Sequence, residues 1–288
     1  VSGLVDALRP DATALAAAFV IDLAVGDPVC PVHPIRLIGG SLRWFEGRLR
    51  ALNWDGYAGG IALFVLLALV WLPALAILMA LVAALSPWAA WLTHVVMLYT
   101  MLALGDLLRH VWRIESAVRS GDLERARTAV SALVGRDTDR MDAAACRRAA
   151  VESLSENVTD GFVSPVAWYV AAGLPGILLF KIVSTMDSMV GYKTPPYRRF
   201  GWCGARLDDV MNYLPARFTW LLMVALAFLL PGLSGRKAWR VGIDQHAVLL
   251  GPNSGWSEAA MAGALGRRLV GPIWLRGFQV TDVWLGDR

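Results

Sequence analysis

The densest group of acidic side chains in the sequence is Glu152, Glu156 and Asp160, spaced four residues apart, with Asn157 beside them. On a helix this spacing brings the carboxylates close to one face, where like charges repel each other. A divalent cation removes that repulsion, and Mg²⁺ binds hard oxygen ligands, usually together with phosphate. Gly161 then allows a sharp exit from the helix. The pattern predicts a metal site, although a helix end with solvated acids and Asp160 as a cap fits the same residues.

A second polar group begins at Asp187 and continues through Gly191 to Lys193. Gly191 allows the backbone to pass close to a ligand, and Lys193 could meet a phosphate or an acid. The group ends in a basic residue and two adjacent acids: Arg206, Asp208 and Asp209. Adjacent acids are a signal for metal or phosphate binding. A salt-bridged loop of Arg and Asp explains the same residues equally well.

Two further segments could contribute polar groups. The first places Asp27, His33 and Arg36 around a proline-rich turn, where His33 could act as a general base or only as a structural hydrogen-bonding residue. The second is the polar loop 251–256, whose backbone N–H groups could hold an anion or form an ordinary turn and cap. None of the motifs GxxxxGK[ST], GxGxxG and HExxH occurs in the sequence. Any nucleotide would therefore be held by a site of another kind.

The composition indicates that these groups are carried by a membrane protein. Of the 288 residues, 57% are hydrophobic and only 17% are charged, against about a quarter charged in soluble domains. Thirteen Trp suit the membrane interface. We attribute the net charge of +4 to Arg-rich loops at an anionic leaflet, because no Lys/Arg run with interleaved aromatic residues suggests nucleic-acid binding. The three cysteines, Cys30, Cys146 and Cys203, show neither zinc nor disulfide spacing.

Two segments, 58–85 and 88–104, are long and apolar enough to cross a bilayer, which needs about 20 helical residues. Ser86 and Pro87 between them predict a tight hairpin. Because basic residues lie beyond both outer ends, the positive-inside rule places these ends in the cytoplasm; the residues are Arg36, Arg43, Arg48, Arg50, Arg109, Arg113 and Arg119. The apolar run 12–20 lacks a basic segment before it, so we expect a first membrane anchor rather than a cleaved signal peptide.

The remaining segments position the acids. Residues 106–160 are polar with helical periodicity, which predicts a helical cytoplasmic insertion. The apolar stretch 163–186 is broken at Gly173–Gly176, which favours a re-entrant hairpin over a single kinked crossing helix. The stretch 214–233 is marginal because Arg217 enters it. We therefore predict an all-α polytopic integral membrane protein with four or five membrane segments, forming a single membrane-embedded domain over the whole chain.

Six segments in order resemble the CobD/CbiB family of membrane synthases of cobalamin biosynthesis, and together they extend over nearly the whole chain. They are GDPVCPVHPIRLIG (26–39), GDLERARTAVSALVGRDT (121–138), AAVESLSENVTDGFVSPVAW (149–168), KIVSTMDSMVGYK (181–193), FGWCGARLDDVMNYLPAR (200–217) and GPNSGWSEAAMAGALG (251–266). The resemblance implies an adenosylcobinamide-phosphate synthase, a ligase that joins adenosylcobyric acid to (R)-1-aminopropan-2-ol or its O-phosphate. The implied cofactors are ATP and Mg²⁺, with the carboxylate activated as an acyl phosphate.

On this interpretation the polar residues receive roles. The expected catalytic residues are Glu152, Glu156, Asp187, Lys193, Arg206 and His33. The expected metal ligands are Glu152, Glu156, Asp160, Asp187, Asp208 and Asp209. The expected substrate-binding residues are Asp27, Arg36, Asn157, Tyr192, Trp202, Asn253 and Ser254.

The resemblance also implies a location and partners. The site would face the cytoplasm from a bacterial inner (plasma) membrane, and the partners would be the lipid bilayer, the corrinoid and amine substrates and other cobalamin-pathway enzymes, without nucleic acid. A corrinoid-binding scaffold or transporter is the main alternative, because a broken helix suits transport. No inverted repeat is visible, however, and the acids gather at one aqueous edge. A regulatory relative without catalysis is the third hypothesis, disfavoured because every acid-bearing motif is present.

Overall fold

The computed structural model describes residues 2–28 and 30–287. The chain forms two compact units of nearly equal size. The first unit contains Val1–Gly105 and Ser164–Met211, and the second contains Asp106–Val163 and Asn212–Arg288. Residues 106–160, predicted as an insertion, thus share a compact unit with the C-terminal part of the chain.

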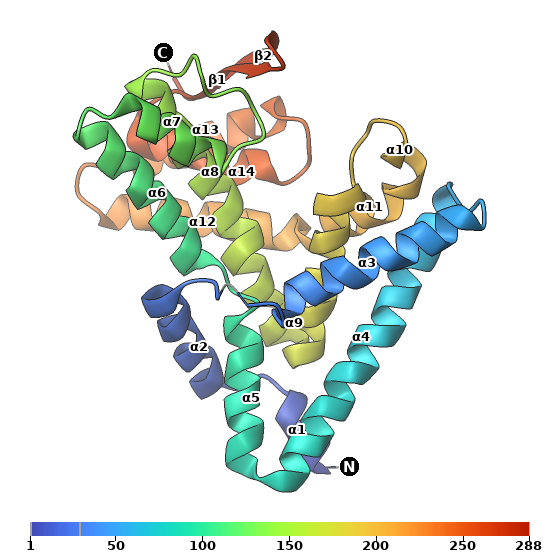
Figure 1. The fold of residues 1–288 in the computed structure, drawn as a ribbon. Coiled ribbons are helices and arrows are strands. Elements are labelled where there is room, and N and C mark those ends of the chain that lie inside the picture. The colour runs from blue at the N-terminus through green and yellow to red at the C-terminus, as the bar shows by residue number, and fades with distance from the viewer. Residues whose placement is uncertain (1, 29, 288) are drawn as a thin grey trace. The chain divides into compact units, whose positions relative to one another are not determined.

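The described residues of the first unit form helices (Figure 1), of which α2, α4, α5 and α9 are mainly apolar. Its hairpin of α4 and α5 forms where the sequence predicts it, because Ser86 accepts a hydrogen bond from Trp88 N (3.2 Å) and Pro87 occupies the first turn of α5. The helices are α1 (Ser2–Leu8), α2 (Ala12–Val25), α3 (Pro34–Ala51), α4 (Tyr57–Leu85), α5 (Pro87–Tyr99), α9 (Ser164–Val190), α10 (Tyr197–Phe200) and α11 (Trp202–Met211).

Three helical stretches among the described residues are long and apolar enough to cross a membrane: Tyr57–Leu85, Pro87–Arg119 and Ala143–Val190. A fourth results if Trp202–Met211 and Tyr213–Leu229, bent by 42° at their junction, count as one span. The polytopic helical prediction is confirmed, with three candidate spans, or four if the bent pair counts as one, against the four or five expected. The expected N-terminal anchor forms α2, whose 14 residues reach only about 21 Å, less than the bilayer core.

The third apolar stretch is broken where the sequence predicts it. Within Ser164–Val190 the backbone leaves helical geometry at Ala172 and Gly173, and Gly173 adopts φ of 64°, which glycine tolerates. A Cβ at Gly176 would collide with the carbonyl oxygen of Trp168, eight residues earlier. Residues eight apart in a continuous helix lie about 12 Å apart. The chain therefore bends sharply at Gly173, and the two helical halves of α9 do not form one continuous helix.

The second unit combines six helices, two short irregular turns and a strand pair among its described residues (Figure 1). A small core of Ile114, Ala117, Ala126, Val130 and Cys146 holds α6, α7 and α8 together. The elements are α6 (Leu104–Arg119), α7 (Leu123–Ser131), α8 (Ala143–Val158), the π-helical turn η1 (Thr159–Val163), α12 (Tyr213–Leu229), α13 (Gly235–Gln245), the 3₁₀ turn η2 (His246–Val248), α14 (Ser254–Leu265), β1 (Leu269–Leu275) and β2 (Phe278–Leu285).

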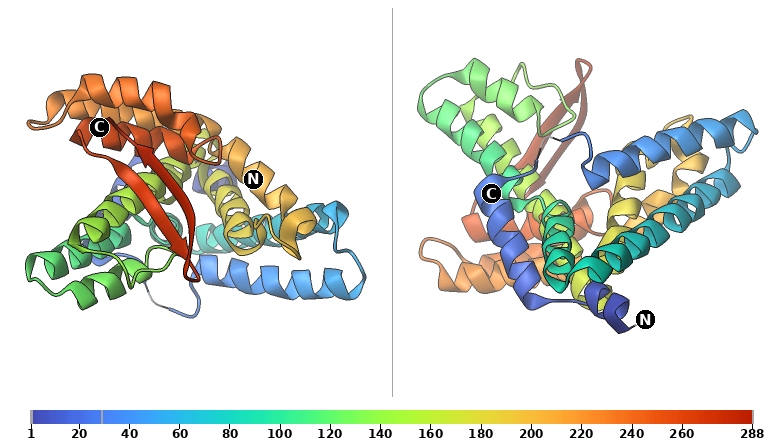
Figure 2. Two further views of the ribbon diagram at one scale, coloured as in Figure 1. Left: turned by 90° about the horizontal axis from the view of Figure 1, so that it is seen from above. Right: turned by 60° about the horizontal axis from the view of Figure 1, so that its bottom comes forward.

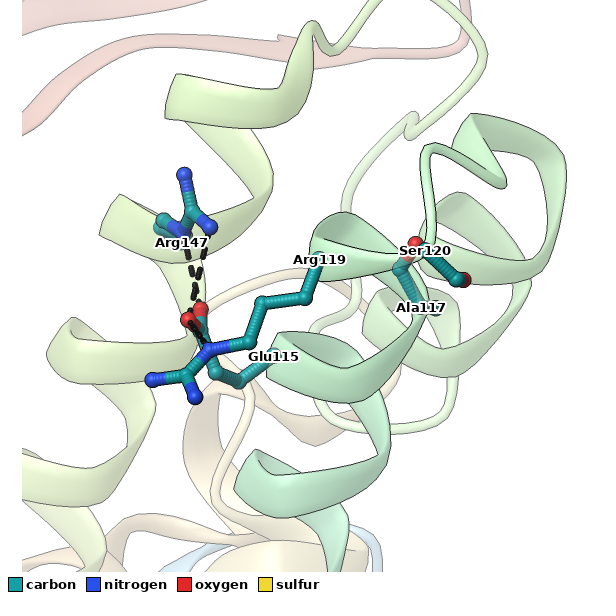
Figure 3. Close-up of polar contacts among 5 residues, drawn as sticks. All are labelled: Glu115, Ala117, Arg119, Ser120 and Arg147. Atoms are coloured by element: carbon teal, nitrogen blue, oxygen red, sulfur yellow. Dashed lines mark hydrogen bonds and ion pairs between the residues drawn. The ribbon is translucent and has the colours of Figure 1, made fainter.

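A surface network joins α6 to α8 in this unit (Figure 3). Arg119 Nε donates to Glu115 Oε1 at 2.7 Å, and Arg147 Nε donates to Glu115 Oε2 at 2.8 Å. At the end of α6, Ser120 Oγ donates to Ala117 O at 2.9 Å. Both arginines are largely exposed, so these pairs orient the helices more than they stabilise them.

The C-terminal strand pair is absent from the all-α prediction. Strands Leu269–Leu275 and Phe278–Leu285 run antiparallel, as the left view of Figure 2 shows. Arg276 and Gly277 form the turn with φ of 51° and 81°. Asp137 accepts hydrogen bonds from both turn N–H groups, at 3.1 and 2.7 Å. The Arg–Gly pair between two alternating apolar runs was the sequence signal for this hairpin.

Candidate active site

The largest convergence of predicted residues lies in the second unit, around the start of its acidic motif. Glu152 and Glu156 project from α8 one turn apart and line an open cavity of about 280 Å³. Arg136, from the loop after α7, lines the same cavity, and its Nη2 donates to Glu152 Oε2 at 2.7 Å. Both side chains of this pair are largely buried, with 8% and 14% exposure. The structure thus confirms that the two glutamates share a face, and adds a guanidinium that offsets one of them.

A third glutamate reaches the same group from α14, which packs against α8. Glu258 is 3% exposed. Burial raises the pKa of Glu258 to about 9, together with the charges of Glu156 and Glu152, while the Arg136 guanidinium offsets part of this effect. Because a pKa of about 9 leaves Glu258 protonated at neutral pH, two carboxylates, those of Glu152 and Glu156, remain against one guanidinium. We call Arg136, Glu152, Glu156 and Glu258 the glutamate cluster.

The glutamate cluster is not assembled as a metal site in the structure. Among residues 2–28 and 30–287, no three His, Cys, Asp or Glu side chains lie in an arrangement that would hold a metal ion. The chemistry of the donors nevertheless suits Mg²⁺, since carboxylate oxygens are its preferred protein ligands. Arg136 Nε is buried and has no hydrogen-bond partner in the described part of the chain. A ligand oxygen would satisfy that donor, so the residues fit a phosphate-bearing ligand with its cation.

The other two residues of the acidic motif, Asn157 and Asp160, are not among the residues that line this cavity. Asn157 Nδ2 donates to Ser153 O at 2.8 Å and to Ser153 Oγ at 3.2 Å, so the amide folds back on its own helix. Asp160 lies in the π-helical turn that follows α8. Such turns occur often at functional sites. The roles expected of Asn157 in substrate binding and of Asp160 in metal binding stay predictions.

In the first unit, a second acid group forms where α11 packs against the end of α9. Asp187 lies close enough to Asp209 for their charges to interact, and Arg206 Nη1 pairs with Asp209 Oδ2 at 3.2 Å. A Cβ at Gly191 would collide with the Asp187 carboxylate, so glycine is needed for this close approach. Asp208 belongs to the same helix. We call Asp187, Arg206, Asp208 and Asp209 the aspartate group.

Exposed aromatic and basic residues lie along the same stretch of chain as the aspartate group. Tyr192 and Trp202 are 56% and 43% exposed, and Trp202 packs edge-on against Tyr57 with ring centroids 5.5 Å apart. Tyr192 OH donates to Ser188 O at 3.1 Å. Lys193 is exposed in the loop after α9. Surfaces of this kind are accessible to a large ligand, which is compatible with the substrate-binding role predicted for Tyr192 and Trp202.

His33 is engaged in the local structure of its turn. Its Nδ1 accepts a hydrogen bond from Ile35 N at 3.3 Å and caps α3. Its Nε2 lies 2.9 Å from Asp27 Oδ1, although the N–H is not aligned for a hydrogen bond. The ring is 3% exposed, whereas Arg36 on the next turn is exposed. This geometry favours the structural role of His33 over that of a general base.

The loop 251–256 in the second unit is also fixed internally. Asn253 Oδ1 accepts a hydrogen bond from Arg217 Nη1 at 3.1 Å, and Arg217 Nη2 donates to Pro252 O at 3.3 Å. The Arg217 guanidinium stacks over the ring of Tyr213, 3.5 Å from its centroid. Ser254 begins α14. Asn253 therefore anchors the start of the helix that carries the third glutamate.

The sequence interpretation missed Arg136 and Glu258. Each belongs to a segment already noted for its resemblance, 121–138 and 251–266, but neither stands out by type or spacing. Their partners lie 16 residues and more than 100 residues away along the chain. Only the folded unit brings them together.

Comparison with known proteins gives the family. A sequence model described as "CobD/Cbib protein" matches residues 15–288. The cobalamin biosynthesis protein CobD of Sinorhizobium sp is 42% identical over 278 residues, 93% of this chain and 85% of the relative. CobD of Photorhabdus laumondii is 40% identical, with 94% and 86% covered, and the cobalamin biosynthesis protein CbiB of Salmonella arizonae is 39% identical, with 94% and 85% covered. The chain belongs to the CobD/CbiB family.

Membership in the CobD/CbiB family supports a role in cobalamin biosynthesis. No solved structure matches the chain. The geometry of the glutamate cluster and of the aspartate group thus rests on this structure alone.

Proposed function

We propose that this CobD/CbiB protein is a ligase that uses ATP and Mg²⁺ to join the carboxylate of adenosylcobyric acid to (R)-1-aminopropan-2-ol or its O-phosphate. The observation that carries the proposal is the glutamate cluster. Its excess negative charge, beside an open cavity of about 280 Å³, suits a divalent cation, and its unsatisfied guanidinium donor suits a phosphate oxygen.

The residues of the glutamate cluster have proposed roles. Glu152 and Glu156 would hold Mg²⁺, and Arg136 would orient a phosphate oxygen by charge-assisted hydrogen bonds. When bound, ATP supplies the phosphoryl group that activates the corrinoid carboxylate. The amine then attacks the activated carboxyl carbon, the amide C–N bond forms, phosphate leaves and the amine loses one proton. The Glu258 carboxyl, with its pKa raised to about 9, already carries a proton at neutral pH, so Glu156 is the candidate of the cluster to accept the amine proton.

The aspartate group of the first unit has a place in the same proposal. Asp187, Asp208 and Asp209 remain candidate metal ligands, and Lys193 and Arg206 remain candidates to offset charge on the transferring phosphoryl group. We place the site on the cytoplasmic face of a bacterial inner membrane, because the Arg-rich segments flank α4 and α5 on one side.

Purified protein in lipid nanodiscs, incubated with ATP, Mg²⁺, cobyric acid and aminopropanol phosphate, tests the proposal. Formation of the amide with release of ADP supports the ligase. Glu156→Ala and Asp187→Ala should each abolish turnover, whereas the control Glu124→Gln should not, because Glu124 is 84% exposed on α7. Corrinoid binding without turnover would overturn the ligase in favour of a scaffold or transporter.

A further inference from the structure

Helix α12 in the second unit has two contrasting faces. One face is packed inside the unit and consists of Pro215, Ala216, Thr219, Trp220, Val224 and Ala227. The opposite face is exposed and almost wholly apolar: Leu214, Phe218, Leu221, Leu222, Leu226 and Leu229. A contiguous apolar stripe of this length is a liability in water, so something apolar covers it.

Helix α13 turns back and runs antiparallel along α12. A Cβ at Gly235 would collide with the ring of Phe228, and one at Gly242 would collide with the indole of Trp220. Eight residues of α13, from Gly235 to Gly242, therefore lie beside nine residues of α12, from Trp220 to Phe228. The ring centroids of Trp220 and Trp239 are 4.6 Å apart, so Trp239 lies on the side of α13 that meets α12.

Helix α13 is too polar to lie in the hydrocarbon core. Four charged residues along it are exposed: Arg236, Lys237, Arg240 and Asp244. If α12 crossed the bilayer, α13 beside its second half would be carried to membrane depth with these charges facing lipid, which is unfavourable. The 17 residues of α12 also reach only about 26 Å, less than a bilayer core of about 30 Å.

The exposed residues of α13 nearest to α12 are of the types found where a protein meets the membrane interface. Trp239 and Ile243 are one turn apart and 47% and 42% exposed. Arg236 precedes Trp239 by three residues on the same side. Trp and Arg side chains next to an apolar stripe are typical of the lipid headgroup region. There the aromatic rings lie at the interface and the cations bind lipid phosphates.

We infer that α12 is not a membrane span but lies in the plane of the membrane interface. Its exposed Leu and Phe side chains enter the acyl region of one leaflet, while Trp239 and Arg236 of α13 contact phospholipid headgroups. The second unit is thereby attached to one leaflet along a helix, and α13, α14 and the loop between them stay on the aqueous side. This inference holds whether or not the protein is a ligase.

Spin labels on single cysteines of the full-length protein test this placement, in nanodiscs of phosphatidylcholine and phosphatidylglycerol. The labels replace Leu214, Leu222 and Leu229 on α12, and Ile61, Leu69 and Ile77 on α4 as the matched series of exposed positions. Cys30 is replaced, while Cys146 and Cys203 can be kept if their removal impairs folding, because they are buried. Depth is measured from the accessibility of each label to oxygen and to a water-soluble nickel chelate.

An in-plane helix predicts one shallow depth, about 5–10 Å below the headgroup boundary, for all three α12 labels. A label at Arg236→Cys should be accessible mainly to the nickel chelate, and the α4 series should pass through the bilayer centre. A depth difference of about 20 Å between Leu214→Cys and Leu229→Cys, with Leu222→Cys deepest, would overturn the inference in favour of a span. Low oxygen accessibility at all three α12 positions would also overturn it, because protein rather than lipid would then cover the stripe.

Discussion

The glutamate cluster and the aspartate group contain similar residues but balance their charges in different ways. In the glutamate cluster, three carboxyl groups share one guanidinium, and the pair of Arg136 and Glu152 is largely buried. In the aspartate group, Arg206 and Asp209 pair with 66% and 33% of their side chains exposed. Water screens the exposed pair, whereas buried charge must be met by a partner, a proton or a cation. The glutamate cluster is therefore where a bound cation would change the free energy most.

The largest effect should come from removing the guanidinium of the glutamate cluster. Arg136→Met leaves Glu152 buried without its partner, which should lower the free energy of unfolding by about 3–5 kcal/mol. Denaturant titration in mixed micelles measures this change. The double variant Arg136→Met/Glu152→Gln should recover part of the loss. A loss no larger than that of Arg206→Met would erase the distinction between the two groups.

The next effect concerns pH and Glu258. The folded pKa of about 9 lies above the unfolded value near 4.5, so the folded state holds the proton more tightly. The contribution of Glu258 to stability should therefore be greatest below pH 4.5 and should fall as pH rises towards 9, by about 1.4 kcal/mol per pH unit within that window. Glu258→Gln, in metal-free buffer, should remove this slope and raise stability at pH 7 by about 3 kcal/mol. An unchanged pH dependence in Glu258→Gln would show that Glu258 ionises normally.

A smaller change in stability is expected from adding a Cβ to the backbone beside each acid group. Gly191→Ala places a Cβ against Asp187 and should lower stability by about 1–3 kcal/mol. Gly135→Ala, beside the glutamate cluster, meets no atom within 4 Å and serves as the matched control, with a change expected within about 0.5 kcal/mol. Thermal unfolding of both variants tests the pair. Equal melting temperatures would mean that Asp187 is not held in the position described.

The smallest effect is expected in the exposed pair of the aspartate group. Arg206→Met should change the free energy of unfolding by less than about 1 kcal/mol, because solvent screens its interaction with Asp209. The same denaturant titration as for Arg136→Met provides the value. A loss of several kcal/mol would show that the aspartate group is as tightly coupled as the glutamate cluster.

Several elements followed from the sequence because their causes are local. The hairpin of α4 and α5 is encoded by two long apolar runs with Ser86 and Pro87 between them. The break in α9 is encoded by Gly173 and Pro175, which interrupt helical geometry whatever surrounds them. The shared face of Glu152 and Glu156 follows from helical periodicity alone.

Other features depend on contacts between residues that are distant in the sequence, and no local sequence pattern indicates them. Glu258 is an ordinary helix residue in the sequence, and only the packing of α14 on α8 makes it part of a cluster. The strand pair after α14 was hidden because its apolar residues also fit a membrane-protein composition. The exposed stripe of α12 becomes distinct from its packed face only when α13 lies beside it.

Cation binding to the glutamate cluster can be measured without either substrate. Mn²⁺, as a paramagnetic substitute for Mg²⁺, is titrated into the purified protein with and without ATP and followed by electron paramagnetic resonance. The double variant Glu152→Gln/Glu156→Gln should weaken binding by at least about tenfold relative to the wild type, while Glu124→Gln should not. Equal Mn²⁺ affinity in the wild type and the double variant would contradict the assignment of the cation to the glutamate cluster.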